Sequence, residues 1–166
     1  MLFISSCSNQ SLENYKSENP KLNLRTFFNG KLFAQGIVQD RSGKVIQRFD
    51  VDINASWKDN QGIIDEKFSY SDNTKSERVW KLTEKTPFKY EGTAHDVIGV
   101  ANGEVSGNAF LFEYRLNVPV GDTTYSINFE DWMYLLDQKT LLAKASMTKW
   151  GFRVGEVTLV MTKKDN

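Results

Sequence analysis

Residues 45–57, Val45-Ile46-Gln47-Arg48-Phe49-Asp50-Val51-Asp52-Ile53-Asn54-Ala55-Ser56-Trp57, are the stretch of sequence that decides the fold. From Phe49 onward every second residue is apolar, and the residues between are charged or polar. Because successive side chains of a β-strand point to opposite faces, this alternation predicts a strand with one buried and one wet face. The predicted buried face holds Phe49, Val51, Ile53, Ala55 and Trp57.

The same alternation recurs along the chain. Residues 108–118 repeat it, and residues 141–148 and 156–161 read as two further strands. Turn-forming residues separate the strands at spacings of about 10–15 residues, and no helical stripe exceeds about three turns. We therefore predict an all-β fold, an antiparallel meander that closes into a barrel or a sandwich. The apolar positions of residues 108–118 are Phe110, Phe112, Tyr114, Leu116 and Val118.

One segment departs from this regularity. The apolar residues are odd-numbered up to Phe129 and even-numbered from Trp132, so the phase slips at Glu130-Asp131. A β-bulge adds one residue and flips the alternation in this way, and bulges gather at barrel rims. We therefore expect a bulge at Glu130-Asp131, although a turn or a short 3₁₀ segment is an equal alternative.

Composition limits the function classes. The chain has 166 residues, 40% of them hydrophobic, which suits one domain with a real core. Its 21 basic and 21 acidic residues leave no electrostatic footprint for nucleic acid. One cysteine and one histidine exclude a disulfide framework, a Cys-rich zinc site and a multi-histidine metal site.

The N-terminus carries a localisation signal. Cys7 follows Ile4-Ser5-Ser6, and this pattern looks like the end of a bacterial lipoprotein signal, in which the cysteine receives lipid. The residues before it lack the basic region and the apolar run of about 7–15 residues of a secretory signal. We expect lipidation at Cys7 and a truncated signal, with a plain thiol as the alternative.

The expected domain organisation follows from that signal. Residues 1–6 are a signal-peptide remnant, residues 7–23 are a lipidated N-terminus and polar flexible tether, and residues 24–166 are the barrel domain. Ser8, rather than Asp, follows the cysteine, which by resemblance to Gram-negative lipoproteins favours the outer membrane. The expected location is the cell envelope, lipid-anchored and facing the periplasm.

Several motifs along the chain carry a family resemblance. They are Phe27-Phe28-Asn29-Gly30, Gly36-Ile37-Val38-Gln39-Asp40-Arg41-Ser42-Gly43, Arg78-Val79-Trp80, Gly92-Thr93-Ala94-His95-Asp96-Val97-Ile98-Gly99, Gly107-Asn108-Ala109, Asp131-Trp132-Met133-Tyr134-Leu135 and Gly155-Glu156-Val157-Thr158-Leu159. This combination resembles the bacterial domain of unknown function 3833 family, whose members look like lipoproteins. The resemblance implies a lipocalin-like β-barrel in the cell envelope and, through neighbouring genes for lipid-modifying enzymes, a connection with lipids. It implies no activity.

Catalytic constellations are weak. His95 and Asp96 are adjacent, so on an extended strand they point to opposite faces and do not form the hydrogen bond of a triad. Glu130 and Asp131 are adjacent too, whereas a retaining glycosidase needs carboxyls on opposing sides of a sugar. We interpret them as rim carboxylates and His95 as a loop residue, with pocket lining as its alternative role.

Arginines and aromatic residues are better candidates for ligand binding. An inward Arg78 could hold a carboxylate or phosphate, or it could pair with an acid across strands; Arg41 is expected in an exposed hairpin. Large aromatic residues either line a ligand cavity or fill the barrel. The candidate ligand-binding residues are Arg78, Trp80, His95, Phe112, Tyr114 and Trp132.

The expected function is binding or shielding of a lipid, fatty acid or other apolar ligand, with no catalysis, metal or cofactor. The expected partners are the membrane, through the lipid anchor, and that ligand. One alternative is a filled barrel that serves as an envelope scaffold or protein-interaction module. A third is a lipid-directed hydrolase or isomerase that uses His95 with Glu130 or Asp131.

Overall fold

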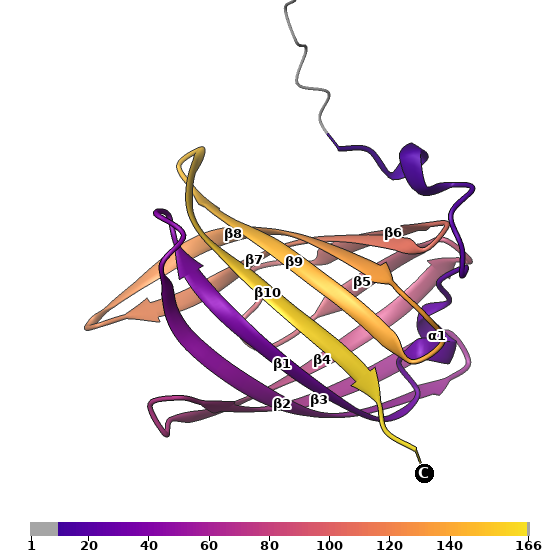
Figure 1. Cartoon of the computed structure of the whole chain (residues 1–166), viewed down its shortest axis with the longest axis horizontal. Coiled ribbons are helices and arrows are strands. Elements are labelled where there is room, and N and C mark those ends of the chain that lie inside the picture. Colours follow the sequence, from indigo (N-terminus) through magenta and orange to yellow (C-terminus); the bar gives the residue numbers. More distant parts are fainter. Residues whose placement is uncertain (1–9, 166) are drawn as a thin grey trace, which may run out of the picture.

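The computed structural model describes residues 10–165, which form a closed barrel of ten antiparallel strands (Figure 1). Each strand pairs with its neighbours in sequence, and the first strand pairs with the last. This confirms the predicted all-β meander and shows that it forms a barrel and not a sandwich. The strands are β1 (Gly30–Asp40), β2 (Val45–Lys58), β3 (Gln61–Tyr70), β4 (Lys75–Thr86), β5 (Lys89–Thr93), β6 (Ala101–Ser106), β7 (Ala109–Val120), β8 (Thr123–Leu135), β9 (Thr140–Lys149) and β10 (Phe152–Lys163).

The alternating stretch lies where its pattern predicts. Phe49, Val51, Ile53 and Ala55 of β2 are buried inside the barrel, and the residues between them are exposed. Trp57 continues the inner face, and its Nε1–H donates to the carbonyl of Phe28 at 2.9 Å. Apolar burial on one face of every long strand thus drives closure of the sheet around one core.

The bulge predicted at Glu130-Asp131 is wrong. β8 runs without a register shift against both β7 and β9, and its inner face continues from Phe129 through Asp131 to Met133. Trp132 and Tyr134 lie on the outer face, where the N-terminal segment covers them. The apparent phase slip therefore arose from a second buried face and not from an extra residue.

That cover is the segment of residues 10–23, which includes the 3₁₀ helix η1 (Leu12–Tyr15). The Tyr15 ring lies 5.9 Å from the Trp132 ring and 5.5 Å from the Tyr134 ring. Further along, the N–H of Leu22 donates to the carbonyl of Gly107 at 2.8 Å. These described residues, expected within a flexible tether, thus pack on the barrel wall, because outward aromatic rings offer them an apolar surface.

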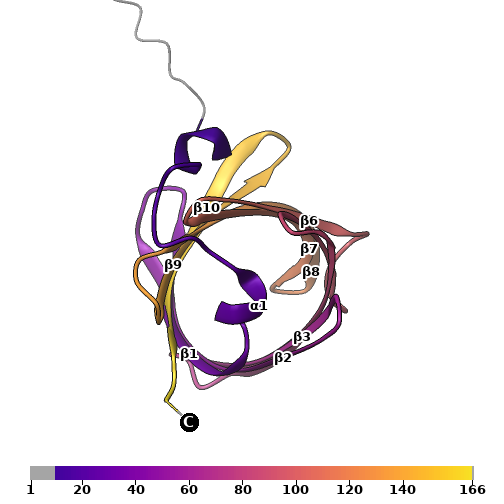
Figure 2. The ribbon, with the colours of Figure 1, turned by 90° about the vertical axis from the view of Figure 1, so that its right-hand side faces the viewer.

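A short helix closes one end of the barrel. α1 (Leu24–Phe27) lies inside the ring of strands (Figure 2), with Leu24 and Phe27 buried. Its N-cap is Asn23, whose Oδ1 accepts from the N–H of Thr26 at 2.9 Å. At the helix C-terminus Lys163 Nζ donates to the carbonyls of Thr26, Phe27 and Asn29 at 2.8–2.9 Å. α1 is a plug fixed at both termini.

The opposite end carries hairpin turns. The β1–β2, β3–β4, β7–β8 and β9–β10 connections project from the barrel at the end away from α1 (Figure 1). No helix within residues 10–165 is long and apolar enough to cross a membrane.

Gly107 tests how the N-terminal segment is attached. Its φ is +58°, and an added Cβ would lie 1.6 Å from the carbonyl oxygen of Tyr15. Gly107→Ala is expected to displace η1 and expose Trp132, with faster amide hydrogen exchange over residues 12–22. Gly121→Ala is a matched control, since Gly121 also has φ +58° but has no atom within 4 Å of an added Cβ. Gly121→Ala therefore introduces only the left-handed backbone strain of about 1 kcal/mol. Equal amide hydrogen exchange over residues 12–22 in both variants would contradict the predicted attachment.

Candidate functional site

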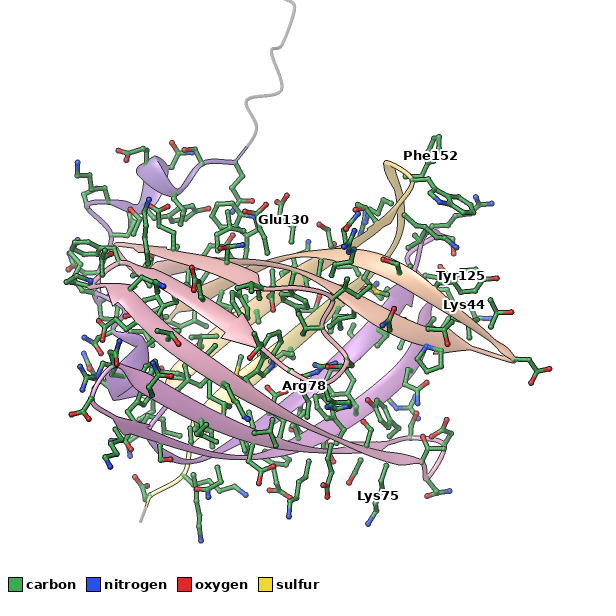
Figure 3. All side chains as sticks on the ribbon, turned by 180° about the vertical axis from the view of Figure 1, so that it is seen from behind. Lys44, Lys75, Arg78, Tyr125, Glu130 and Phe152 are labelled. Atoms are coloured by element: carbon green, nitrogen blue, oxygen red, sulfur yellow. The ribbon has the colours of Figure 1, made fainter. Side chains whose placement is uncertain are left out.

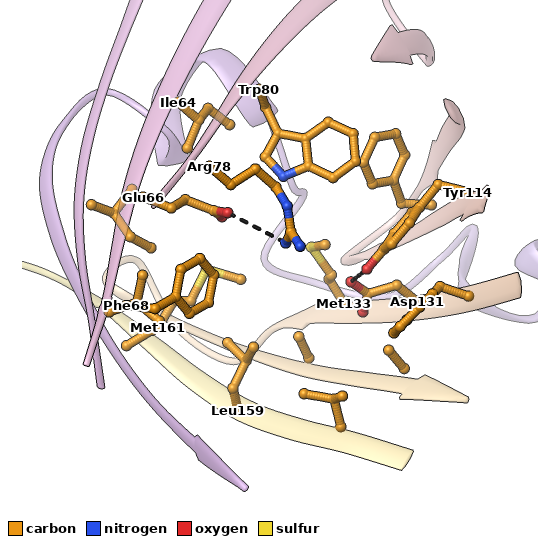
Figure 4. A pocket seen from close by; sticks show the side chains of 18 of the residues that line it. Ile64, Glu66, Phe68, Arg78, Trp80, Tyr114, Asp131, Met133, Leu159 and Met161 are labelled. Carbon is orange, nitrogen blue, oxygen red and sulfur yellow. Dashed lines mark hydrogen bonds and ion pairs between the residues drawn. The ribbon is translucent and has the colours of Figure 1, made fainter. Parts of the chain in front are cut away.

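The barrel encloses a cavity of about 310 Å³ between α1 and the hairpin end. Its wall is mostly apolar, with Phe68, Trp80 and Leu159 among the residues that line it (Figure 4). The charged residues of the lining are Glu66, Arg78 and Asp131. A largely apolar pocket with a few polar groups is typical of a small-molecule site.

The strands bring these three groups together by their alternation. Glu66 follows Ile64 on the inner face of β3, and its register partner on β4 is Arg78. Asp131 holds an inward position of β8 between Phe129 and Met133. A charged residue therefore takes the place of one apolar residue on each of three strands.

Arg78 forms the main ion pair of the site. Its Nη2 lies 2.7 Å from Asp96 Oδ2, and its Nε donates to both oxygens of Asp96 at 3.0–3.1 Å. Its Nη1 lies 3.8 Å from Glu66 Oε2. The guanidinium also lies over the rings of Phe68 and Trp80, at 5.6 and 5.8 Å from their centroids. Arg78 is thus fixed by an acid on one side and two aromatic faces on another.

Asp96 belongs to the connection between β5 and β6, residues 94–100. The carbonyl of Asp96 accepts from the N–H of Asn117 at 3.0 Å, and the N–H of Ile98 donates to the carbonyl of Arg115 at 2.8 Å. These bonds hold the connection against β7, while the Asp96 side chain reaches Arg78 on β4. The pair therefore joins β4 to β7 beyond the ends of the short strands β5 and β6.

The electrostatics of the cluster divide its acids into two kinds. Burial raises the pKa of Asp96, but the hydrogen bonds and charge of Arg78 outweigh it, and the net pKa is lowered. Burial raises the pKa of Glu66 to about 7, although the Arg78 charge opposes it. Burial also raises the pKa of Asp131 to about 7, against the hydrogen bond that Tyr114 Oη donates to Asp131 Oδ2 at 3.3 Å. Asp96 is thus a fixed anion, and Glu66 and Asp131 are groups that titrate near neutrality.

Two carboxylate oxygens in this cluster accept no hydrogen bond within residues 10–165, and one of them, Glu66 Oε2, has only the 3.8 Å ion pair with Arg78. Glu66 Oε2 and Asp131 Oδ1 are inaccessible to solvent and accept no hydrogen bond from any described residue. A buried acceptor without a donor costs about 1–3 kcal/mol, more when it is charged. The cluster therefore holds unused acceptor capacity inside the cavity.

The predicted ligand-binding residues fall into two groups. Arg78, Trp80, Phe112 and Tyr114 line the cavity. His95 is exposed on the 94–100 connection, and Trp132 lies on the outer wall under Tyr15. His95 and Trp132 therefore lie outside the cavity, because the connection and β8 turn their side chains away from the interior.

The two acids predicted at the rim separate. Glu130 is exposed on the outer face of β8, where its Oε1 accepts from Trp132 Nε1–H at 2.8 Å, and Figure 3 shows it away from Arg78. Asp131 is buried deep in the barrel and not at its rim. Within residues 10–165 the cavity lining contains no His, Ser, Thr or Cys side chain, and no group of three or more His, Cys, Asp or Glu residues could hold a metal.

Sequence reasoning missed Glu66 and the partner of Arg78. The available signal was phase: Glu66 is spaced by two from Ile64 and Phe68, as an inward residue must be. Arg41 lies exposed in the β1–β2 turn, as expected of a hairpin arginine. Cys7 and its lipidation lie outside the described residues, so the anchor and the envelope location stay predictions.

An exposed aromatic patch lies at the hairpin end. Trp150 and Phe152, at the tip of the β9–β10 hairpin, are 84% and 74% exposed. Lys149 Nζ lies 4.1 Å from the centroid of the Trp150 ring and 3.4 Å from that of Tyr125. Phe152 and Tyr125 lie at the same end of the barrel (Figure 3).

Comparisons with known proteins give a family and a fold. The family model described as "Protein of unknown function (DUF3833)" matches residues 1–163. Among solved structures, the S-type phycobiliprotein lyase CPES from Guillardia theta superposes with a TM-score of 0.63 at 10% identity, covering 95% of this chain and 99% of that one. A de novo designed fluorescence-activating β-barrel matches with a TM-score of 0.46 at 10% identity, covering 86% and 99%. No curated protein matches the chain.

The ion pair yields a stability prediction. Arg78→Met leaves Asp96 and Glu66 without their cation, so the free energy of unfolding is expected to fall by about 3 kcal/mol. Lys164→Met removes an exposed pair, Lys164 Nζ to Asp52 at 3.0 Å, and should cost less than about 1 kcal/mol. Urea unfolding followed by tryptophan fluorescence measures both, and equal losses would show that the buried pair has no special role.

The raised pKa values predict an unusual pH dependence. Asp131 has an ordinary pKa of 3.8 and a folded pKa of about 7, so between these values the folded state binds more protons than the unfolded state. Stability should therefore rise as the pH falls from about 8 towards 5. Asp131→Asn, which still accepts from Tyr114, should raise stability near pH 8 by on the order of 2 kcal/mol and flatten the profile. Thermal melts across this range test it; a wild-type profile that falls towards pH 5 would contradict it.

Proposed function

Because the chain belongs to the DUF3833 family, whose function is unknown, we propose its function from the cavity: it binds one small, mainly apolar ligand inside the barrel without transforming it. The observation that carries the proposal is the cavity of about 310 Å³, whose apolar wall surrounds a single polar cluster. A filled barrel acting as a scaffold would need side chains in that space.

The apolar wall supports a lipid-like ligand. Aliphatic and aromatic side chains from β1, β2, β3, β9 and β10 face the cavity, including Val38, Phe68 and Leu159. Burial of an apolar chain against them is worth about 25 cal/mol per Å² removed from water. The polar cluster would fix one end of such a ligand, as a few polar groups do in apolar sites generally.

The geometry supports entry from the hairpin end. α1 occupies the other end, with Leu24 and Phe28 both facing the cavity. The lining reaches partly exposed residues near the hairpins, among them Tyr70 and Val118. A ligand would thus pass between the hairpin turns and not through the plug.

Filling the cavity tests the proposal. Ala143→Phe adds a ring to a buried lining residue of β9 and is expected to weaken ligand binding at least tenfold. Lys144→Phe, the next residue on β9 with its side chain exposed, is the matched control and should bind as the wild type does. Native mass spectrometry of the full chain, expressed in bacteria and purified gently, should show a co-purifying lipid mass that is lost only in Ala143→Phe. Equal lipid retention by both variants would refute binding in the cavity.

A further inference from the structure

Resting on the proposed function, we propose that the ligand presents N–H or O–H donors to Glu66 and Asp131, so that the site takes amine- or hydroxyl-headed amphiphiles and rejects free carboxylates. Four observations lead to this ligand class.

The first observation is the occupation of Arg78. An inward arginine is the obvious partner for a fatty-acid carboxylate. Here its Nε and Nη2 already hold both oxygens of Asp96, and its Nη1 faces Glu66 Oε2 at 3.8 Å. The Nε and Nη2 edge of the guanidinium, which would bind both oxygens of a ligand carboxylate, is therefore occupied by Asp96.

The second observation is the free acceptor capacity. Glu66 Oε2 and Asp131 Oδ1 are both buried and accept no hydrogen bond within the described part of the chain. The Asp131 residue is only 7% exposed, and both Glu66 and Asp131 line the cavity. A ligand donor that reaches either oxygen recovers the free energy of an unsatisfied buried acceptor.

The third observation is the sign of the charge. Asp96, Glu66 and Asp131 outnumber Arg78, the one cation of the cluster among the described residues. A ligand anion would add a further negative charge in a region of low dielectric, where repulsion is strong. A cationic head would instead balance the excess.

The fourth observation is the separation of the two acceptors on opposite walls. Glu66 belongs to β3 and Asp131 to β8, with Arg78 between them and Tyr114 beside Asp131 in Figure 4. Tyr114 Oη already donates to Asp131 Oδ2, so its proton is not free for a ligand carbonyl. Each of these two walls thus offers an acceptor to an N–H or O–H of the ligand, which favours primary amines and hydroxyl-bearing head groups over ethers, esters and ketones.

Matched ten-carbon amphiphiles test this specificity. Decylamine, decanol and decanoate share one tail, so their affinities for the full-length protein differ through the head group alone. Isothermal titration calorimetry near pH 8 is expected to show decylamine and decanol binding at least tenfold more tightly than decanoate. Asp131→Asn and Glu66→Gln should each weaken decylamine about tenfold, the worth of one charge-assisted hydrogen bond, and leave decanoate no weaker.

The control and the outcomes separate the two proposals. Glu113→Gln changes an exposed acid on β7 and should leave every affinity unchanged. Decanoate binding as tightly as decylamine would overturn the head-group inference while leaving ligand binding intact. A preference for decylamine that survives both variants would overturn the assignment to Glu66 and Asp131. Absence of binding by all three amphiphiles would overturn the inference and the proposed cavity ligand together.

Discussion

The structure depends on one interaction, the ion pair between Arg78 and Asp96. β5 and β6 are too short to complete the wall between β4 and β7, and the connection of residues 94–100 occupies that place. Backbone hydrogen bonds fix this connection to β7, and the Asp96 side chain fixes it to β4 through Arg78. The same contact sets the charge of the cavity, because it occupies the guanidinium that would otherwise neutralise Glu66 and Asp131. Wall closure and the charge of the cavity thus share one cause.

Buried charge in an apolar barrel is costly, and the cluster shows how the cost is distributed. Both carboxylate oxygens of Asp96 accept hydrogen bonds from Arg78, and Asp96 remains an anion. Glu66 and Asp131 make weaker interactions with Arg78 and Tyr114, so burial dominates and raises their pKa values towards neutrality. Replacing such groups by apolar side chains often stabilises a protein, so these buried acids do not raise the stability of the barrel.

The sequence predicted the barrel because its signal is repeated. The alternation in β2 and β7 is long enough to identify both strands and their inner faces, including Phe110 and Phe112. The site was harder to predict for a local reason: a charged residue within an alternating strand looks like a wet-face residue unless its phase is followed, as at Glu66. The wrong prediction of a bulge in β8 has a different cause. Trp132 faces outward, where an apolar residue is not expected, and Tyr15 covers it there. Contacts between distant segments, such as Arg78 with Asp96, leave no periodic pattern to follow.

The attachment of the plug by Lys163 has a consequence for the order of events during synthesis. Lys163 is the last residue of β10, yet its ammonium group holds the carbonyls at the C-terminus of α1, and β10 supplies the closing partner of β1. Neither the closed wall nor the seated plug can form until the final strand has left the ribosome. A contact of such long sequence separation forms slowly, and the nascent sheet presents unpaired edges meanwhile. The barrel therefore acquires its enclosed interior last, when β10 pairs with β1.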